Sequence, residues 1–241
     1  MRRIASIIRA SDQGVSRPFL CKDDDNACWW CKGHLSGKQT QRLEWVCAHL
    51  ARLLSLPVPD FEIMEVPIDL FELWRSFHRD CGDIFVTSAN PFVFSSRHIP
   101  DCQDLSENSP FLTKGDRVLQ ARIFVFDQLI RNTDRTNVNS NVLVDAFEKA
   151  IHVIDHNNAF DPAFDEKSFL ENHVFREAYL ALSPKERSDL TEDIHHKISA
   201  FDLEAVWNEM PEAWTAEIEI ETGLTMDNVR SILCTPLNPL P

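Results

Sequence analysis

The strongest constraint on the fold is the uneven distribution of strand-like and helix-like patterns along the 241 residues. Short strand-like runs occupy the first third, together with one helix of about residues 38–55 in which apolar side chains recur at steps of three and four. From about residue 168 to residue 233 the pattern is helical. This segregation predicts an α+β fold with an N-terminal sheet lobe and a mainly helical C-terminal lobe, because a doubly wound sheet would alternate strands and helices.

Prolines mark two of the boundaries along the chain. The segment Leu56-Pro-Val-Pro59 ends the first helix, because proline cannot continue the hydrogen-bond ladder. Residues 89–113 contain Pro91, Pro100 and Pro110, and we expect an irregular connection or a lid there. We expect strands at residues 4–8, 19–22, 27–33, 61–66, 83–88, 142–144 and 151–154, and further helices at residues 68–77 and 114–130.

Composition limits the classes of partner. The formal net charge of −14 repels phosphate backbones and anionic membranes, so we expect neither a nucleic acid nor a membrane as partner. The apolar stretch Ile4 to Ile8 is too short for a secretory signal or a spanning helix, which predicts a cytoplasmic protein. Seven scattered cysteines, with Cys28 and Cys31 on opposite faces of a strand, indicate reduced thiols. The sequence gives no indication of the oligomeric state.

Two polar segments in the middle of the chain carry the chemistry. Phosphoryl transfer needs a carboxylate beside the acceptor hydroxyl, oxygen ligands for magnesium and cations on the phosphates. Asp134 and Asn139 stand five residues apart after a helix, and they could supply the base and one metal ligand. Asp155 follows the next strand and could supply a second ligand. These three side chains predict an active site that uses magnesium.

The same segments resemble the catalytic and metal loops of HipA-like kinases, and more distantly those of phosphatidylinositol kinases. The matching residues are Asn132-Thr-Asp-Arg-Thr-Asn-Val-Asn-Ser-Asn-Val-Leu143 and Ile154-Asp-His-Asn-Asn-Ala-Phe160. Trp30-Cys-Lys32 is similar to the strand that ends in the ATP-binding lysine of that family. Leu43-Glu-Trp-Val-Cys-Ala-His-Leu-Ala-Arg-Leu-Leu-Ser-Leu-Pro-Val-Pro59 is similar to the helix that follows, and the resemblance covers about residues 4–160.

The resemblance implies a two-lobed protein-kinase-like fold. It places a nucleotide-binding lobe with a small antiparallel sheet and one helix in residues 1–90, and a mostly helical catalytic lobe in residues 91–241. It implies that Asp134 is the catalytic base and that Asn139 and Asp155 hold Mg²⁺. Lys32 would contact the phosphates of ATP, and Glu44 would orient Lys32.

The residues around Lys32 support its assignment separately. On a strand, Lys32 shares a face with Cys28 and Trp30, so we expect it to point inward among apolar neighbours. A buried lysine needs a negative partner, which either an ATP phosphate or Glu44 would supply.

The sequence departs from the family pattern in three places. Full-length HipA toxins are longer at the N-terminus, and several relatives carry His where this chain has Thr136. Gly14 is the only glycine before Lys32, so the nucleotide loop is poor in glycine. Ser16 lies in this loop, and some relatives are silenced by autophosphorylation there, so Ser16 is a candidate for the same modification.

These observations predict a serine/threonine protein kinase that transfers the γ-phosphate of ATP to a protein hydroxyl. Ser16 makes the protein itself a candidate substrate. Two alternatives stay open. One is a kinase that acts on a lipid or a small molecule, since the loop pattern is shared with the phosphatidylinositol kinases. The other is a pseudokinase that binds nucleotide or a partner and transfers nothing, for which the glycine-poor loop is the only argument.

Overall fold

A computed structural model describes residues 2–11, 17–33, 36–78, 85–105, 116–145, 150–216 and 224–240, together with Ser109 and Phe147. Ser16 lies outside the described residues, and so does the first part of the strand expected at residues 83–88. The expectation is wrong for residues 85–88, which contain only an isolated bridge between Thr87 and Asn90. The chain divides into two compact units that are discontinuous in sequence. Unit 1 comprises Met1–Trp45, Pro59–Pro100 and Trp207–Thr222, and unit 2 comprises Val46–Val58, Asp101–Val206 and Gly223–Pro241.

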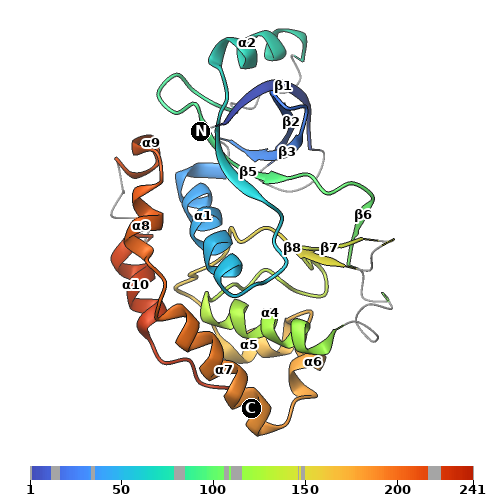
Figure 1. Cartoon of the computed structure of the whole chain (residues 1–241), viewed down its shortest axis with the longest axis vertical. Helices are drawn as coiled ribbons and strands as arrows, with labels where there is room; N and C mark the ends of the chain where they lie inside the picture. The colour runs from blue at the N-terminus through green and yellow to red at the C-terminus, as the bar shows by residue number, and fades with distance from the viewer. Residues whose placement is uncertain are drawn as a thin grey trace. The chain divides into compact units, whose positions relative to one another are not determined.

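Unit 1 is built on a closed five-stranded barrel in the order β1-β2-β3-β5-β4 (Figure 1). Four neighbouring pairs are antiparallel, and the barrel closes through a short parallel contact in which Arg2 and Arg3 of β1 pair with Met64 and Glu65 of β4. The strands are β1 (Arg2–Ala10), β2 (Phe19–Asp23), β3 (Cys28–Lys32), β4 (Phe61–Glu65) and β5 (Phe92–Arg97).

The α+β class is confirmed, whereas two details of the expected sheet are wrong. The strands do not form a purely antiparallel sheet, because β1 and β4 run parallel where the barrel closes. The region expected to be an irregular connection contains β5 and also β6 (Cys102–Asp104). β5 pairs along its length with both β3 and β4, so distant strands fix its conformation.

The barrel interior takes alternate side chains from each strand. On β3 these are Trp29 and Cys31, which belong to one buried cluster with Phe19, Met64 and Val93. Lys32 lies on the other face, so the expectation that it points inward with Cys28 and Trp30 is wrong. Its side chain is still only 12% exposed, because a helix covers this outer face.

That helix is α1 (Gly37–Leu53), whose first half packs on the outside of β3 and β5. The side chain of Gln41 accepts a hydrogen bond from the backbone N–H of Phe94 and donates one to the carbonyl of Gly33. The Trp45 ring meets the Phe61 ring edge-on, with centroids 5.5 Å apart. A second helix, α2 (Ile68–Phe77), buries Phe71 and Trp74 against the cluster of the barrel.

Unit 2 is mostly helical and contains a small antiparallel sheet. The sheet has the order β6-β7-β8, with β7 (Val142–Asp145) and β8 (Ile151–Val153) as a hairpin. α4 (Arg117–Leu129) packs against α6 (Arg176–Leu180) and α7 (Pro184–Ile198), and α5 (Glu166–Asn172) precedes α6 (Figure 1). In the part of the chain that the structure describes, three further helices follow: α8 (Leu203–Asn208), α9 (Glu212–Thr215) and α10 (Met226–Cys234).

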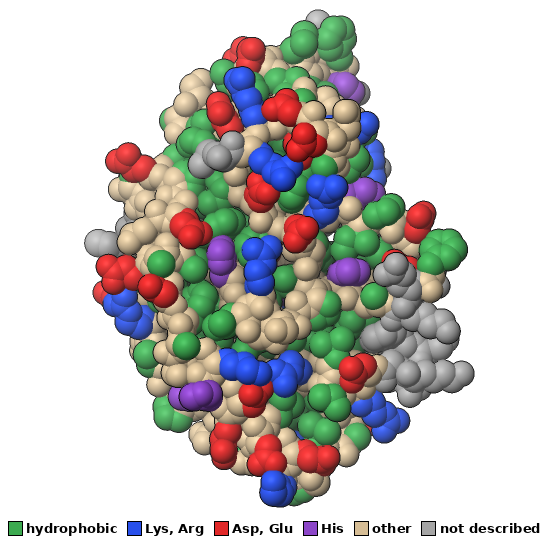
Figure 2. Space-filling model, in the orientation of Figure 1, with side chains coloured by type: hydrophobic (Ala, Val, Ile, Leu, Met, Phe, Trp, Pro, Cys, Tyr) green, Lys and Arg blue, Asp and Glu red, His purple; other side chains and the backbone are tan. Residues whose placement is uncertain are grey.

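Charged side chains of both signs are interspersed on the face drawn in Figure 2. The net negative charge is therefore not gathered into one patch on that face. Within the described ranges, no helix combines the length and the hydropathy needed to cross a membrane.

Candidate active site

A compact polar loop follows α4 directly and carries Asp134. The helix ends at Leu129 with Ile130 as its C-cap, and Arg131 turns the chain away with a left-handed backbone conformation (φ 52°). The backbone N–H of Thr136 donates to the carbonyl oxygens of Asp134, at 3.1 Å, and of Asn139, at 2.9 Å. The backbone N–H of Asn139 donates in return to Oγ1 of Thr136. These bonds close the loop on itself, which holds Asp134 and Asn139 on one short turn.

The carboxylate of Asp134 is held by two amide side chains. Nδ2 of Asn139 lies 2.9 Å from Oδ2 of Asp134, and Nδ2 of Asn141 lies 3.1 Å from the same oxygen. Asp134 is half-buried, while Asn139 is exposed. Among the described residues, Oδ1 of Asp134 accepts no hydrogen bond. One carboxylate oxygen is therefore fixed, and the other is left for a group that approaches from solvent.

Asp155 lies beside this loop because the backbone joins the two segments. The N–H of Ile154, immediately before Asp155, donates to the carbonyl of Asn141 at 3.0 Å. Asn141 and Asp155 both have positive φ, 47° and 56°. Positive φ is uncommon for residues other than glycine, and it persists where the surrounding structure fixes it. The structure thus brings together Asp134, Asn139 and Asp155, the three residues that the sequence singles out.

A fully buried ion pair anchors the loop to α4. Nε of Arg135 lies 2.6 Å from Oδ2 of Asp127, and neither side chain has any exposed surface. Asn132 donates from Nδ2 to Oδ1 of Asp127 at 2.9 Å. A buried charge pair is tolerated when further hydrogen bonds satisfy the remaining donors and acceptors, as they do here.

Arg135 also connects the loop to the segment that carries Asp155. Its Nη1 donates to the carbonyl of Asn141 at 2.6 Å and to the carbonyl of Ile154 at 3.2 Å. A single guanidinium therefore joins α4, the Asp134 loop and the residue before Asp155. The rigid planar fork of arginine suits this role, because it offers five donors in fixed directions.

His173, which follows α5, completes the buried network. Its Nε2 lies 3.0 Å from Oδ2 of Asp127, and its Nδ1 accepts from the backbone N–H of Phe175 at 3.1 Å. Nε2 therefore carries the proton and donates to Asp127, with the ring neutral. Burial, opposed in part by Asp127, lowers the pKa of His173. Burial disfavours ionisation of Asp127, but Arg135 and His173 outweigh it and hold the pKa of Asp127 well below its usual range.

In unit 1, Lys32 and Glu44 form an ion pair. Nζ of Lys32 contacts Oε1 of Glu44, and the two side chains are 12% and 3% exposed. Glu44 lies on α1 and Lys32 at the end of β3, so a strand and a helix position the pair. The order along the chain led us to expect this partnership.

Gly33, directly after Lys32, permits the close packing of this strand end. A Cβ atom built at Gly33 would lie 2.3 Å from the carbonyl oxygen of Phe85 and 2.2 Å from its ring. Phe85 is buried and stacks on Phe19 with ring centroids 4.1 Å apart, so it has little room to move. Only glycine therefore fits at position 33, directly after Lys32, because any side chain there would overlap Phe85.

The oxygen ligands near Asp134 suit magnesium. Within the described residues, no group of three or more His, Cys, Asp or Glu side chains could hold a metal ion. Magnesium does not need such a group, because it keeps several waters and binds through one or two carboxylates together with substrate phosphates. Asp155 offers a carboxylate, and Asn139 and Asn141 retain their Oδ1 oxygens because their Nδ2 groups bond Asp134. This donor set fits Mg²⁺.

The fold is that of a kinase. The chain is similar to the crystal structure of the Helicobacter pylori proinflammatory kinase CtkA, with 13% identity and a TM-score of 0.52, over 95% of this chain and 90% of that one. A crystal structure of the Golgi casein kinase matches with 11% identity and a TM-score of 0.48, over 97% of this chain and 70% of that one. No curated protein matches the sequence.

A family model described as HipA-like kinase matches residues 4–237. The chain therefore belongs to the HipA-like kinase family, and the resemblance in the sequence is confirmed. The match extends well beyond the motifs of residues 4–160 and includes nearly all of the helical C-terminal part.

The network that supports the site is not predicted from the sequence motifs. Asp127 lies in the helix expected at residues 114–130, where a carboxylate within the apolar run Ile123-Phe-Val-Phe-Asp-Gln-Leu-Ile130 is a sign of a buried, paired charge. Arg135 belongs to the motif of the catalytic loop, but the resemblance implies no role for it. His173 had no signal, because its partner Asp127 lies 46 residues away.

Proposed function

We propose that this kinase transfers the γ-phosphoryl group of ATP, in the presence of Mg²⁺, to a serine or threonine hydroxyl of a protein. The observation that carries the proposal is the half-buried carboxylate of Asp134. Two amides hold one of its oxygens, and Arg135 ties its loop to the segment of Asp155. Membership of the HipA-like kinase family supports the same reaction.

In this proposal Asp134 acts as the base. Its Oδ2 is fixed by Asn139 and Asn141, so Oδ1 is free to accept the proton of the acceptor hydroxyl. A general base must lie within hydrogen-bond reach of the proton that it removes, and a fixed carboxylate keeps that geometry from one turnover to the next. Bound Mg-ATP supplies the phosphoryl group and the divalent charge that neutralises it.

Asp155 and Asn139 are proposed to hold the metal through their side-chain oxygens. Asn141 is the second candidate for the amide ligand, because it offers its Oδ1 in the same way. Arg135 positions this set, since it bonds the backbone on both sides. A divalent cation bound by Asp155 would reduce the repulsion between the carboxylates of the site and the phosphates of ATP.

Lys32 is proposed to contact the phosphates, with Glu44 as the group that orients it. The ion pair holds the ammonium in place although it is largely buried. Ser16 is proposed as a site of autophosphorylation. A phosphate there would add up to two negative charges to the loop before β2.

The test is incubation of the purified protein with Mg²⁺ and ATP labelled at the γ-phosphate, followed by mass spectrometry. A generic protein mixture serves as acceptor, and Asp134→Asn protein serves as the matched control. Label on Ser or Thr, of the protein itself or of the mixture, supports the proposal when the control shows none. Label only on phosphoinositides or a small metabolite would identify a different kind of kinase. Nucleotide binding with no transfer to any acceptor would identify a pseudokinase.

A further inference from the structure

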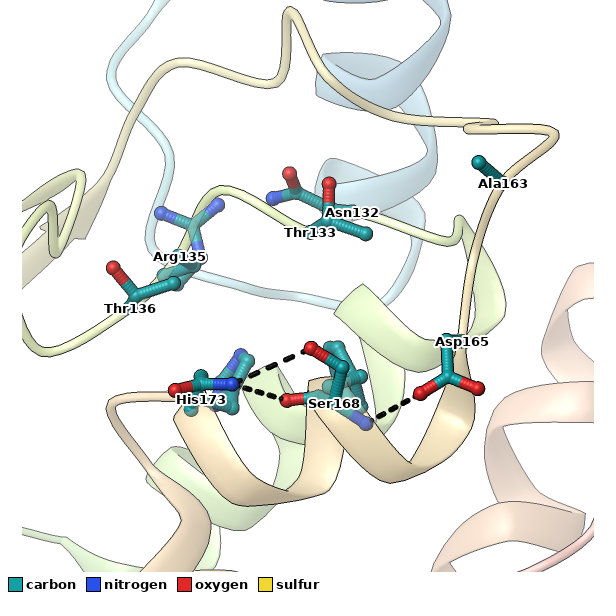
Figure 3. A pocket seen from close by; sticks show the side chains of 10 residues that line it. Asn132, Thr133, Arg135, Thr136, Ala163, Asp165, Ser168 and His173 are labelled. Carbon is teal, nitrogen blue, oxygen red and sulfur yellow. Dashed lines mark hydrogen bonds between the residues drawn. The ribbon is translucent and has the colours of Figure 1, made fainter.

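A cavity of about 270 Å³ lies beside the Asp134 loop within unit 2 (Figure 3). Thr133 and Thr136 of the loop line one wall, and residues of α5 and its N-cap line the other. The volume is at the lower limit of pockets for small molecules, which span roughly 300–1,000 Å³. The cavity is therefore the right size for one side chain of a larger ligand.

The buried part of the lining leaves no cation for an anionic ligand. Among the described residues that line the cavity, Arg135 is the only Lys or Arg, and its guanidinium has no exposed surface. Its donors are directed to Asp127 and to backbone carbonyls. His173 is also buried, and its proton is donated to Asp127. A phosphate or carboxylate would therefore find no available positive charge among these described side chains.

The exposed part of the lining carries negative charge. Asp165 lines the cavity as the N-cap of α5, where its Oδ1 accepts from the backbone N–H of Ser168 at 2.8 Å. Asp161 does not line the cavity itself, but it contacts a residue of the lining, because the hydroxyl of Thr133 donates to Oδ2 of Asp161 at 3.3 Å. A cavity with an exposed carboxylate in its lining, and no available cation among its described lining residues, attracts a positively charged group.

Two residues that line the cavity are close in sequence to Asp134, the proposed base. Thr133 immediately precedes Asp134, and Thr136 follows it by two residues. An extended peptide advances at most about 3.3–3.6 Å per residue. A side chain one or two positions from an acceptor hydroxyl at Asp134 is therefore within reach of the cavity.

We propose that this cavity is a specificity subsite that receives a Lys or Arg side chain located one or two residues from the phosphorylated serine or threonine. Asp165 provides the charge that selects it. The proposal rests on the proposed transfer to a protein hydroxyl, and it adds the class of substrate: a polypeptide segment in which a basic residue neighbours the acceptor.

The test measures peptide binding without ATP, so that it does not depend on phosphotransfer. Two fluorescein-labelled nine-residue peptides carry a central Ser and have either Arg or Gln at the second position on each side. Fluorescence anisotropy gives the Kd of each peptide for the full chain. We expect the wild-type protein to bind the Arg peptide about threefold to fivefold more tightly, which is the range for one solvent-exposed ion pair, and to lose this preference in high salt.

Asp165→Asn isolates the charge, because Asn is as good an N-cap as Asp and preserves α5. Glu171→Gln is the matched control: this exposed carboxylate lies on the same helix but does not line the cavity. Asp165→Asn should reduce the ratio of the two Kd values to about one, and Glu171→Gln should leave it unchanged. Equal or absent binding of the two peptides by the wild type, or a ratio that survives Asp165→Asn, overturns the subsite.

Phosphorylation of the same peptides separates the two proposals. Binding that depends on Asp165 without any phosphotransfer would support the subsite and contradict the proposed function. Phosphorylation of the central Ser with no preference between the Arg and Gln peptides would support the function and overturn the subsite.

Discussion

Arg135 and Asp127 form an ion pair from which solvent is fully excluded, with Nε of Arg135 2.6 Å from Oδ2 of Asp127. The two residues belong to different elements, since Asp127 lies near the end of α4 and Arg135 directly follows the proposed base. The pair holds together only because other groups satisfy both partners. Asn132 and His173 donate to Asp127, and backbone carbonyls accept from Arg135. We therefore expect changes to this pair to affect both the stability of the fold and phosphotransfer, and the two effects can be measured separately.

Asp127→Asn should destabilise the protein by about 3–5 kcal/mol, because it leaves the guanidinium of Arg135 buried without a counter-charge. The double variant Asp127→Leu/Arg135→Met should regain part of this loss, since it removes both charges. Both variants should lose phosphotransfer: the double variant lacks the bond from Arg135 to Ile154, and Asp127→Asn lacks the charge that positions Arg135 for that bond. Urea unfolding and a labelling assay measure the two effects.

Asp189→Asn is the control for this comparison, because it removes one partner of the exposed pair with Lys185. An exposed pair is worth at most about 1 kcal/mol. If Asp127→Asn lowers the free energy of unfolding no more than Asp189→Asn does, the structural role given to the buried pair is wrong.

Lys32→Met should abolish the thermal stabilisation that Mg-ATP gives and should sharply reduce turnover. It should also lower the melting temperature of the free protein, because Glu44 is 3% exposed and loses its charged partner. Glu44→Gln should reduce turnover less, since Lys32 stays present. Lys22→Met changes a lysine on the neighbouring strand and should affect neither quantity. Near-normal turnover in Lys32→Met would show that the phosphate contact lies elsewhere.

Gly33→Ala should lower both the melting temperature and the affinity for Mg-ATP. The added methyl group would overlap the ring and carbonyl of Phe85, and such overpacking costs about 1–3 kcal/mol. Relief would require β3 to move, and Lys32 with it. Gly37 has φ 75° but no atom within 4 Å of a Cβ, so Gly37→Ala tests backbone strain without a clash. A nucleotide affinity that falls equally in both variants would argue against the link to Lys32.

Much of the fold follows from local patterns, and the site motifs follow from a few side chains. The helix expected at residues 68–77 has those bounds as α2, and the helix expected at 38–55 is α1. β7 and β8 lie where short runs rich in Val and Ile indicate strands. Asp134, Asn139 and Asp155 are predicted from the sequence because carboxylates and amides after strands and helices suit a base and metal ligands, and their roles stay predictions.

What the sequence could not provide depends on contacts between distant residues. β5 was missed because Phe92 to Arg97 follows Pro91 in a region rich in proline, and its strand conformation is fixed by β3 and β4 on either side. Barrel closure rests on two residue pairs between β1 and β4, which no local pattern reveals. The prediction for the interior face of β3 is wrong because each face of the strand carries one Trp and one Cys, so these residues do not distinguish the two faces.

Stability should fall as the pH decreases from about 6.5 to 4. Burial, followed by the charge of Arg52, lowers the pKa of His49 to about 4, and burial also lowers the pKa of His173. A base whose pKa is lower in the folded state binds fewer protons there than in the unfolded chain. Stability therefore rises with pH through this window and is fully present above the unfolded pKa of about 6.5. Each histidine contributes a slope of at most about 1.4 kcal/mol per pH unit.

His49→Gln should flatten this dependence, and His196→Gln, which changes an exposed histidine of α7, should not. Urea unfolding between pH 7.5 and 4.5 measures the slopes. Protonation of Asp127 lowers the stability further only in more acidic solution, because the pKa of this carboxyl lies well below its usual range. Equal slopes in the wild type and His49→Gln would show that His49 is not held neutral by burial.

Asp134 and Asp155 should fail in different ways when each is changed to Asn. Asp155 is proposed to ligate the metal, so loss of its charge should weaken Mg-ATP binding itself. Asp134 is proposed to face the acceptor hydroxyl, which arrives with the substrate, and an Asn there can still accept from Asn139 and Asn141. A ligand at about 100 times its Kd stabilises the folded state by about 2.7 kcal/mol, which a thermal-shift assay resolves. At subsaturating ATP, Asp134→Asn should keep the shift and lose phosphotransfer, and Asp155→Asn should lose both. If the two variants exchange these behaviours, the assignments of base and metal ligand are reversed; if both stay active, the active site lies elsewhere.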